Sequence, residues 1–233
     1  MTTTLTRSPA ATRADTRTVR RVAAAVLLPL GPLSVAILRG ILPYHTTDEG
    51  SGLLDHAASA LGRMDAVVWL GLLATLTLVP SALAAGRLAH RRAPRLTLAG
   101  LTLLVPAYLV LPIVNNDILV RTAAADADRT AALRILDAAG SHGAAAVAGV
   151  IFVAGHILGA ILLGTALWRS GAIPAWAGIC VIVSQPLHLV FAAIVPNAFL
   201  DAGAWGLTAL GFAVAAARVL RTSNDDWDLG PTA

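Results

Sequence analysis

The feature that most constrains this chain is a series of six long apolar stretches separated by short polar segments. The hydrocarbon core of a bilayer is about 30 Å thick and an α-helix rises about 1.5 Å per residue, so each crossing needs around 20 apolar residues. Only 13% of the residues are charged, whereas an average soluble domain has roughly 25%. We therefore predict an all-α protein, a polytopic membrane helix bundle with six transmembrane helices.

The apolar stretches also define the expected domain organisation. Residues 1–19 lack the large apolar side chains that would let them order, so they are expected to form a disordered tail. A membrane domain should follow at residues 20–221, and a short polar tail at residues 222–233. Between the third and fourth spans, residues 123–139 resemble a short surface helix. The six spans are expected at about residues 22–44, 65–88, 96–114, 143–168, 172–195 and 199–220.

The arginines predict an orientation. The chain has no lysine, which favours a high-GC bacterial source, and 12 of its 17 arginines lie in tails and loops on the side of the N-terminus. By the positive-inside rule, both termini are expected in the cytoplasm, with the spans in the plasma membrane. Arginines at the ends of apolar spans indicate topology and lipid contacts, so the lipid bilayer is an expected partner and nucleic acid is not.

An internal repeat is a further hypothesis. When the chain is shifted by 80 residues, the second and third spans overlie the fourth and fifth without a gap, Pro94 meets Pro174, and Pro106 meets Pro186. Many transporter folds are built from such repeats. Both hairpins would run in the same direction, so the repeat would be a parallel one.

Two histidines within the spans are the first candidates for a functional site. His156 is near the middle of the fourth span, and His188 is about two turns inside the outer end of the fifth. Counting back from the turn at Ser170 places them at similar depth, close enough to touch. Ionisable residues inside a bilayer cost free energy and usually face protein or water. We therefore consider three roles for these histidines: forming a hydrogen bond between helices, binding a ligand or proton, or coordinating a metal or haem.

Other polar residues extend this candidate ligand site. Ser184 and Gln185 precede Pro186, which frees a backbone carbonyl where polar side chains can gather. At the outer ends of the spans, a further set can rim a vestibule leading down to the histidines, or can simply be solvated loop residues. Its members are Asp65, Asn115, Asn116, Asp117, Asn197 and Asp201.

The Gly155-His156-Ile157-Leu158-Gly159 sequence has the small-xxx-small pattern that lets helix backbones approach closely. The Gly155/Gly159 face is therefore expected to contact another helix. That helix can belong to the same chain, to a second copy in a homo-oligomer, or to a partner membrane protein.

The segment from Gly155 to Gly178, GHILGAILLGTALWRSGAIPAWAG, and the following Ser184-Gln185-Pro186-Leu187-His188 carry a family resemblance. They are similar to a stretch of small six-span membrane proteins of unknown function from high-GC, actinobacteria-like bacteria. The resemblance covers mainly the fourth and fifth spans. It implies the number of spans and the location, and it adds no catalytic residue.

The sequence leaves three functional classes open. It has no Walker loop, nucleophile elbow, zinc-protease or dinucleotide motif, which disfavours an enzyme, and we predict no catalytic residue and no cofactor. The favoured hypothesis is a small ligand-binding or transport-type bundle with a polar site open to the outer face. The alternatives are a non-catalytic accessory membrane protein, or a redox protein that binds haem or a metal through His156 and His188.

Overall fold

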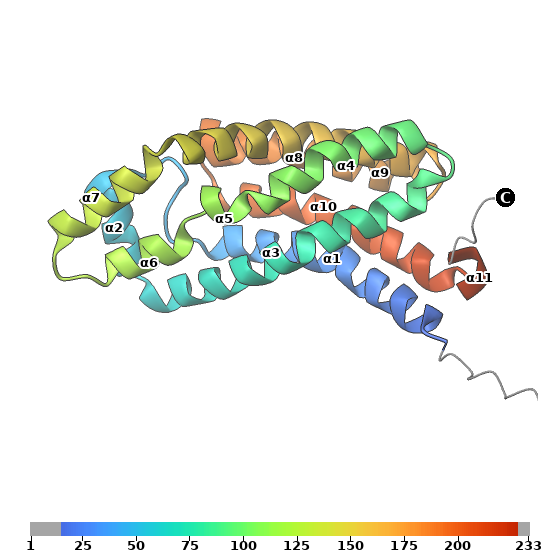
Figure 1. Ribbon diagram of the computed structural model, residues 1–233. Coiled ribbons are helices and arrows are strands. Elements are labelled where there is room, and N and C mark those ends of the chain that lie inside the picture. The colour runs from blue at the N-terminus through green and yellow to red at the C-terminus, as the bar shows by residue number, and fades with distance from the viewer. Residues whose placement is uncertain (1–14, 228–233) are drawn as a thin grey trace, which may run out of the picture.

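The computed structural model describes residues 15–227, and every regular element within that range is helical, as an all-α bundle requires (Figure 1). Residues 1–14 and 228–233, which belong to the two expected tails, lie outside the described residues. The first helix already begins at Arg17, within the segment expected to be disordered. It is held there because the Arg21 guanidinium donates to the backbone carbonyls of Leu220 and Thr222 near the other end of the chain.

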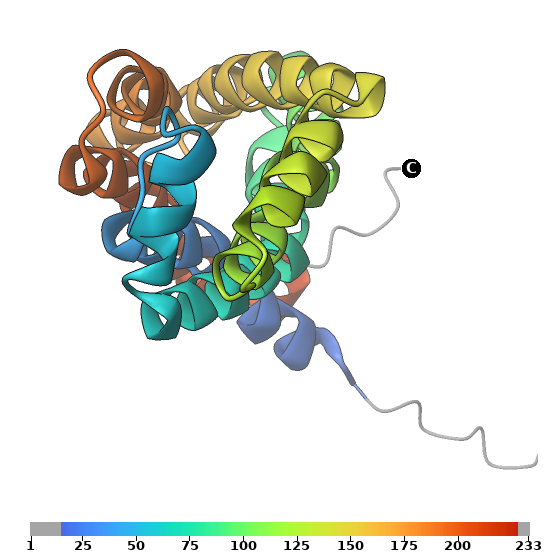
Figure 2. The ribbon, with the colours of Figure 1, turned by 90° about the vertical axis from the view of Figure 1, so that its left-hand side faces the viewer.

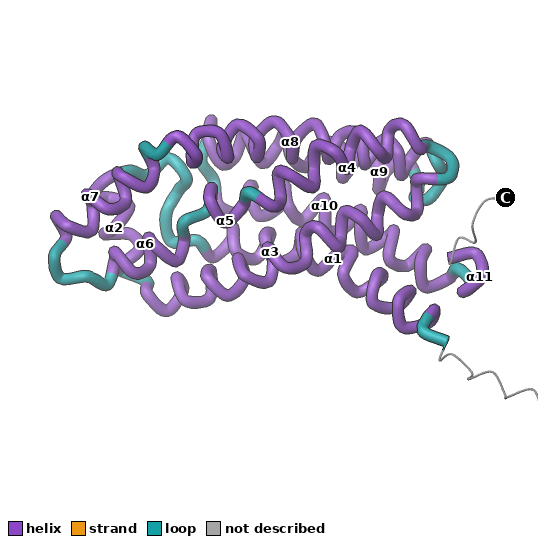
Figure 3. Tube along the Cα trace, viewed as in Figure 1, coloured by secondary structure: helices purple, strands orange, loops and turns teal. Residues whose placement is uncertain are grey.

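Six long helices form a closed ring in chain order. Each makes its most extensive contacts with the helices before and after it, and the last packs along the first to close the ring, as the end-on view shows (Figure 2). Most of the short remaining helices and the loops lie toward the two ends (Figure 3). The helices of the ring are α1 (Arg17–Ile41), α3 (Leu61–His90), α4 (Pro94–Leu109), α8 (Gly143–Arg169), α9 (Ala175–Leu189) and α10 (Ala198–Arg221).

By length and composition, five helices of the described chain can cross a membrane, and six can if a bent pair counts as one crossing. The bent pair is the third expected span, residues 96–114, which is not one continuous helix. It breaks after α4, and α5 (Leu111–Val114) and α6 (Asp117–Ala124) continue at 42°. Pro112 lacks the N–H that would continue the hydrogen bonds of α4, and it is tolerated in the first turn of a new helix.

The fifth expected span, residues 172–195, also changes its helix type before its end. α9 gives way after Leu189 to a π-helical turn, η1 (Val190–Ile194). α4 ends at Leu109 and α9 ends at Leu189, so the two breaks are separated by the same offset as the hypothetical repeat. The duplicated hairpin itself stays a prediction.

The Gly155/Gly159 face packs against α4 of the same chain. A Cβ atom built on Gly155 would lie 2.6 Å from the Leu103 carbonyl oxygen, and one on Gly159 would lie 2.9 Å from the Leu104 nitrogen. Only glycine allows the two backbones to come so close. Of the contacts expected for this face, the structure shows the one within the same chain, and a contact with a second copy or a partner protein stays a prediction.

Three short helices form an outer cap at the end of the ring opposite the described termini (Figure 1). They are α2 (Gly50–Ala58), α6 and α7 (Arg129–Gly140). The helix expected at residues 123–139 is present as α7 but begins only at Arg129, because the Asp128 carboxylate accepts from the Ala131 N–H at 2.9 Å and starts the helix there. The cap has its own buried cluster, made of Leu54, Ala57, Met64, Val120, Ala123, Ala124 and Ala132.

A carboxylate in the loop before α2 makes the stability of the cap depend on pH. Burial opposes the ionisation of Asp48, but hydrogen bonds from the His45 N–H and the His56 ring, both 2.9 Å, outweigh it and lower the pKa of Asp48. A lowered carboxyl pKa stabilises the fold above the unfolded value of about 3.9 and loses this effect as pH falls through the folded value. Asp48→Asn should therefore lower the melting temperature at pH 7, and the difference should shrink as pH falls below about 4, through the lowered folded pKa of Asp48.

Circular dichroism melts in detergent between pH 3 and pH 8 check this expectation. Asp137→Asn, at an exposed position of α7 in the same cap, is the matched control and should show no such convergence. A melting-temperature difference for Asp48→Asn that stays constant down to pH 3 would contradict the assignment.

Candidate functional site

A cavity of about 190 Å³ lies inside the ring and contains both histidines. We call it the histidine cavity. Side chains from α1, α5, α8, α9, η1 and α10 line it, and most of them are apolar. Its polar members are Arg39, Thr46, Asn115, His156 and His188. The two breaks in the helices both border it, with Leu111 and Val114 on one side and Ala192 and Ala193 on the other.

The histidines touch within a row of aromatic rings. The ring centroids of His156 and His188 are 5.6 Å apart in an edge-on arrangement. His156 stacks on Phe152 with centroids 4.2 Å apart, and His188 meets Trp205 edge-on at 5.5 Å. The hydrogen bond between Nδ1 of His156 and the Phe152 carbonyl requires Nδ1 to carry the proton, because a carbonyl can only accept. In the neutral ring, Nε2 of His156 is then an acceptor.

Two residues that line this cavity each carry a polar atom without a hydrogen-bond partner. Within residues 15–227, four buried side-chain nitrogen or oxygen atoms are unpartnered, and two of them, Nε2 of His156 and Nε1 of Trp205, belong to residues that line the histidine cavity. The first is an acceptor in the neutral ring, and the second is a donor. Leaving such a group unpaired costs about 1–3 kcal/mol, so the cavity favours an occupant that can both donate and accept.

A buried ion pair orients His188. Asp201 is 1% exposed, and its two carboxylate oxygens are taken by Nε of Arg39 and Nδ1 of His188. The Arg39 side chain, 14% exposed, also donates to the Thr46 hydroxyl at 2.7 Å. Because the carboxylate neutralises the guanidinium, the polar side of the cavity carries little net charge.

Ser184 and Gln185, predicted as ligand residues, do not line the histidine cavity. The Ser184 hydroxyl donates to the Ala204 carbonyl at 2.7 Å, and the Gln185 amide donates to the Thr208 hydroxyl at 3.1 Å. These bonds join α9 to α10. Their role in this structure is to connect two buried helices, with no contact to the cavity.

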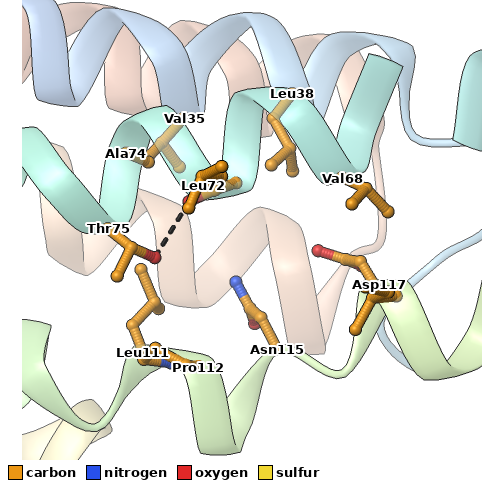
Figure 4. Close-up of a pocket in the computed structure, with 12 residues that line it drawn as sticks. Val35, Leu38, Val68, Leu72, Ala74, Thr75, Leu111, Pro112, Asn115 and Asp117 are labelled. Carbon is orange, nitrogen blue, oxygen red and sulfur yellow. Dashed lines mark hydrogen bonds between the residues drawn. The ribbon is translucent and has the colours of Figure 1, made fainter. Parts of the chain in front are cut away.

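The outer residues Asn115, Asn116 and Asp117 border further cavities. One of about 290 Å³ lies between α1, α3, α5 and α6 and includes Asn115 and Asp117 (Figure 4). Another of about 180 Å³ under the outer cap includes all three residues. Asn115 borders both of these and the histidine cavity, so the three hollows meet at this side chain. We call these adjoining hollows the vestibule.

Tyr44 connects this vestibule to the loop that follows α1. Its hydroxyl donates to the Asp117 carboxylate at 2.6 Å. Burial and the nearby carboxylate of Asp117 raise the pKa of Tyr44, so the phenol keeps its proton and remains a donor.

Two of the predicted vestibule residues lie elsewhere. Asp65 is half-exposed and forms an ion pair with Arg121 on the surface, with a shortest distance of 2.6 Å. Asn197 caps the start of α10 by accepting from the Leu200 N–H at 3.0 Å. Neither borders the histidine cavity. Asp201 lies behind His188 and positions its ring.

Sequence reasoning missed Arg39, Thr46 and Trp205. Arg39 lies inside the first expected span, so the rule that singled out the histidines also applies to it. In the arginine distribution it is one of the five arginines on the other side, where it indicates topology only. Its partner Asp201 is 162 residues away, and no local pattern relates the two positions.

The cavity limits the prosthetic groups that it can hold. At about 190 Å³, it is smaller than the roughly 300–1,000 Å³ of typical cofactor pockets, so a haem does not fit this geometry. No group of three or more His, Cys, Asp or Glu side chains within residues 15–227 is arranged to hold a metal ion. The two histidines alone would supply two nitrogen ligands.

No family model, curated protein or solved structure matches the chain. The likeness to six-span proteins of high-GC bacteria stays a prediction. Function is therefore inferred from the geometry of the histidine cavity.

Proposed function

We propose that this protein is a small ligand-binding or transport-type membrane bundle whose ligand occupies the histidine cavity and enters through the outer cap. We further propose that the bundle lies in the bacterial plasma membrane with both termini in the cytoplasm, as the arginine distribution favours. The outer cap then faces the cell exterior.

The observation that carries this proposal is the pair of unpartnered polar atoms in one cavity, Nε2 of His156 and Nε1 of Trp205. A hydroxyl group within reach of both atoms would satisfy them, because it accepts one hydrogen bond and donates another. The remaining wall is largely apolar. The favoured ligand is thus a small molecule with a hydroxyl or similar donor-acceptor group and a short apolar part.

The broken helices support the same conclusion. Irregular backbone at membrane depth is tolerated where it is buried in protein or lines a cavity, and transporter sites are typically built from discontinuous helices. Here α4 and α9 both break, and the residues after both breaks border the histidine cavity. π-Helical turns such as η1 are also frequent at functional sites.

The alternative classes gain less support. A two-histidine metal site needs additional ligands from solvent, although each Nδ1 has the carbonyl or carboxylate partner typical of metal-bound histidine. For an accessory role, the partner surface expected at Gly155 and Gly159 is covered by α4.

Access from outside can be tested by cysteine labelling. In a Cys180→Ala background, Ala192→Cys places a thiol at a buried position that lines the histidine cavity. A membrane-impermeant methanethiosulfonate added outside intact cells should modify it, because water reaches the cavity through the cap. Ala160→Cys, buried to a similar degree on α8 away from the cavity, should remain unmodified. Equal protection of the two thiols would contradict the proposal.

The same labelling reports the chemistry of the ligand. Millimolar 1-butanol should slow the modification of the Ala192→Cys thiol, while its isomer diethyl ether, which cannot donate, should be much less effective. His156→Phe removes the acceptor to which only the alcohol can donate, so it should reduce the difference between the two isomers. Trp205→Phe removes a donor that both isomers can use, so it should leave the difference in place. Equal effects of both isomers on the native cavity would overturn the proposed donor-acceptor ligand.

A further inference from the structure

A second hollow lies at the opposite end of the bundle, between the end of α3 and the start of α4. This groove, of about 420 Å³, is lined by Leu83, Gly86, Arg87, His90, Thr97 and Leu101. It lies beside the described C-terminal residues, since the Arg87 guanidinium donates to the Trp227 carbonyl at 2.9 Å and stacks 5.0 Å from that ring. It shares no lining residue with the histidine cavity.

The groove has a basic end and an apolar end. Arg87 and His90 lie in the last turns of α3, and the exposed Arg91, Arg92 and Arg95 follow within the next five residues. The α3–α4 connection contains no acidic residue. At its other end the groove is lined by the apolar side chains of Leu83, which is exposed, and Leu101. Such a surface matches a negative headgroup followed by an acyl chain.

A buried hydroxyl in the groove also lacks a partner. Thr97 is 1% exposed, lines the groove, and its Oγ1 has no hydrogen bond within residues 15–227. It lies in the first turn of α4, which starts after Ala93 without a side-chain cap. The start of a helix carries a partial positive charge and free N–H groups, which favour an anion. The hydroxyl can donate to a phosphate oxygen.

We propose that this groove is a binding site for an anionic phospholipid, with the phosphate beside Arg87, His90 and Thr97 and an acyl chain along Leu83. Charge complementarity argues for this occupant, because the basic end accepts the phosphate and the apolar end is already suited to hydrocarbon. In the orientation proposed above, the lipid would come from the inner leaflet, where anionic headgroups meet the arginine-rich end of the bundle.

Native mass spectrometry of the full-length protein in detergent tests this site with added palmitoyl-oleoyl phosphatidylglycerol or phosphatidylcholine. The protein should prefer phosphatidylglycerol on the order of twentyfold, and Arg87→Gln should reduce this preference about fivefold. Arg63→Gln, at the other end of the same helix, is the matched control and should leave it unchanged. Equal binding of both lipids, or equal losses for the two arginine variants, would overturn the proposal.

The Thr97→Val variant distinguishes a hydroxyl that binds the lipid phosphate from a hydroxyl that only stabilises the fold. Without added lipid, this variant should melt at the same or a higher temperature, because it removes an unpaired buried group. It should also lose part of the stabilisation given by phosphatidylglycerol. A lower melting temperature with an unchanged lipid preference would contradict the site. Stabilisation by free glycerol 3-phosphate equal to that by phosphatidylglycerol would show a soluble anion site and overturn the lipid assignment.

Discussion

Asp201→Leu should lower the free energy of unfolding by about 3–5 kcal/mol, the loss typical when one partner of a buried ion pair is removed. The substitution leaves the charge of Arg39 without its carboxylate and the Nδ1–H of His188 without its acceptor. Both groups face the interior of the ring, where water cannot fully replace the lost partner. Denaturant unfolding in detergent, followed by circular dichroism, measures the loss.

Two comparisons test the cause of this loss. The double variant Arg39→Met/Asp201→Leu removes both charges and should recover much of the stability, giving a large coupling energy in a double-mutant cycle. Asp65→Leu breaks the surface pair with Arg121 and should cost no more than about 1 kcal/mol. If the double variant is no more stable than Asp201→Leu, the ion pair does not explain the effect.

Gly155→Ala and Gly149→Ala, less than two turns apart on α8, should change stability in opposite directions. A methyl group at Gly155 would lie 2.6 Å from the Leu103 carbonyl oxygen and 2.9 Å from the Ala107 Cβ, so α4 must move away. Overpacking of this kind costs about 1–3 kcal/mol. Gly149 has open space around it, and alanine there should stabilise the helix by roughly 0.5–1 kcal/mol.

Denaturant unfolding of Gly155→Ala and Gly149→Ala in detergent, followed by circular dichroism, tests these opposite changes in stability. Gly159→Ala should behave like Gly155→Ala, since its added methyl would meet the Leu104 backbone at 2.9 Å. Two alanine variants with the same stability would show that α4 and α8 have room to separate. The close approach would then not contribute to the stability of the bundle.

The helical class and the positions of the long helices follow from the sequence, because the bilayer imposes one length and one polarity on every span. The breaks at Val110 and Val190 did not follow. Hydropathy depends on composition alone, and residues on both sides of each break remain apolar. Pro112 and Pro186 marked the neighbourhood, yet a proline is compatible with a continuous kinked helix as well as with a break.

The site was predictable only in part. His156 and His188 stood out because an ionisable residue within an apolar span is costly, and their similar depth followed from counting turns. The vestibule set mixed Asn115, which borders the cavity, with Asp65, which lies on the surface. Distance along the chain gives the depth of a residue, whereas its direction around the ring depends on contacts between helices.

The closed ring also has a consequence for synthesis. Arg39 lies in the first helix and its carboxylate partner Asp201 in the last, 162 residues later. At about 5–20 residues per second, roughly 8–30 s separate their emergence from the ribosome. During that interval, the guanidinium must stay near the headgroups or be held by the insertion machinery. Arg39 can therefore form its buried ion pair only after α10 has been inserted. A nascent chain arrested before Asp201 should be degraded early by membrane proteases.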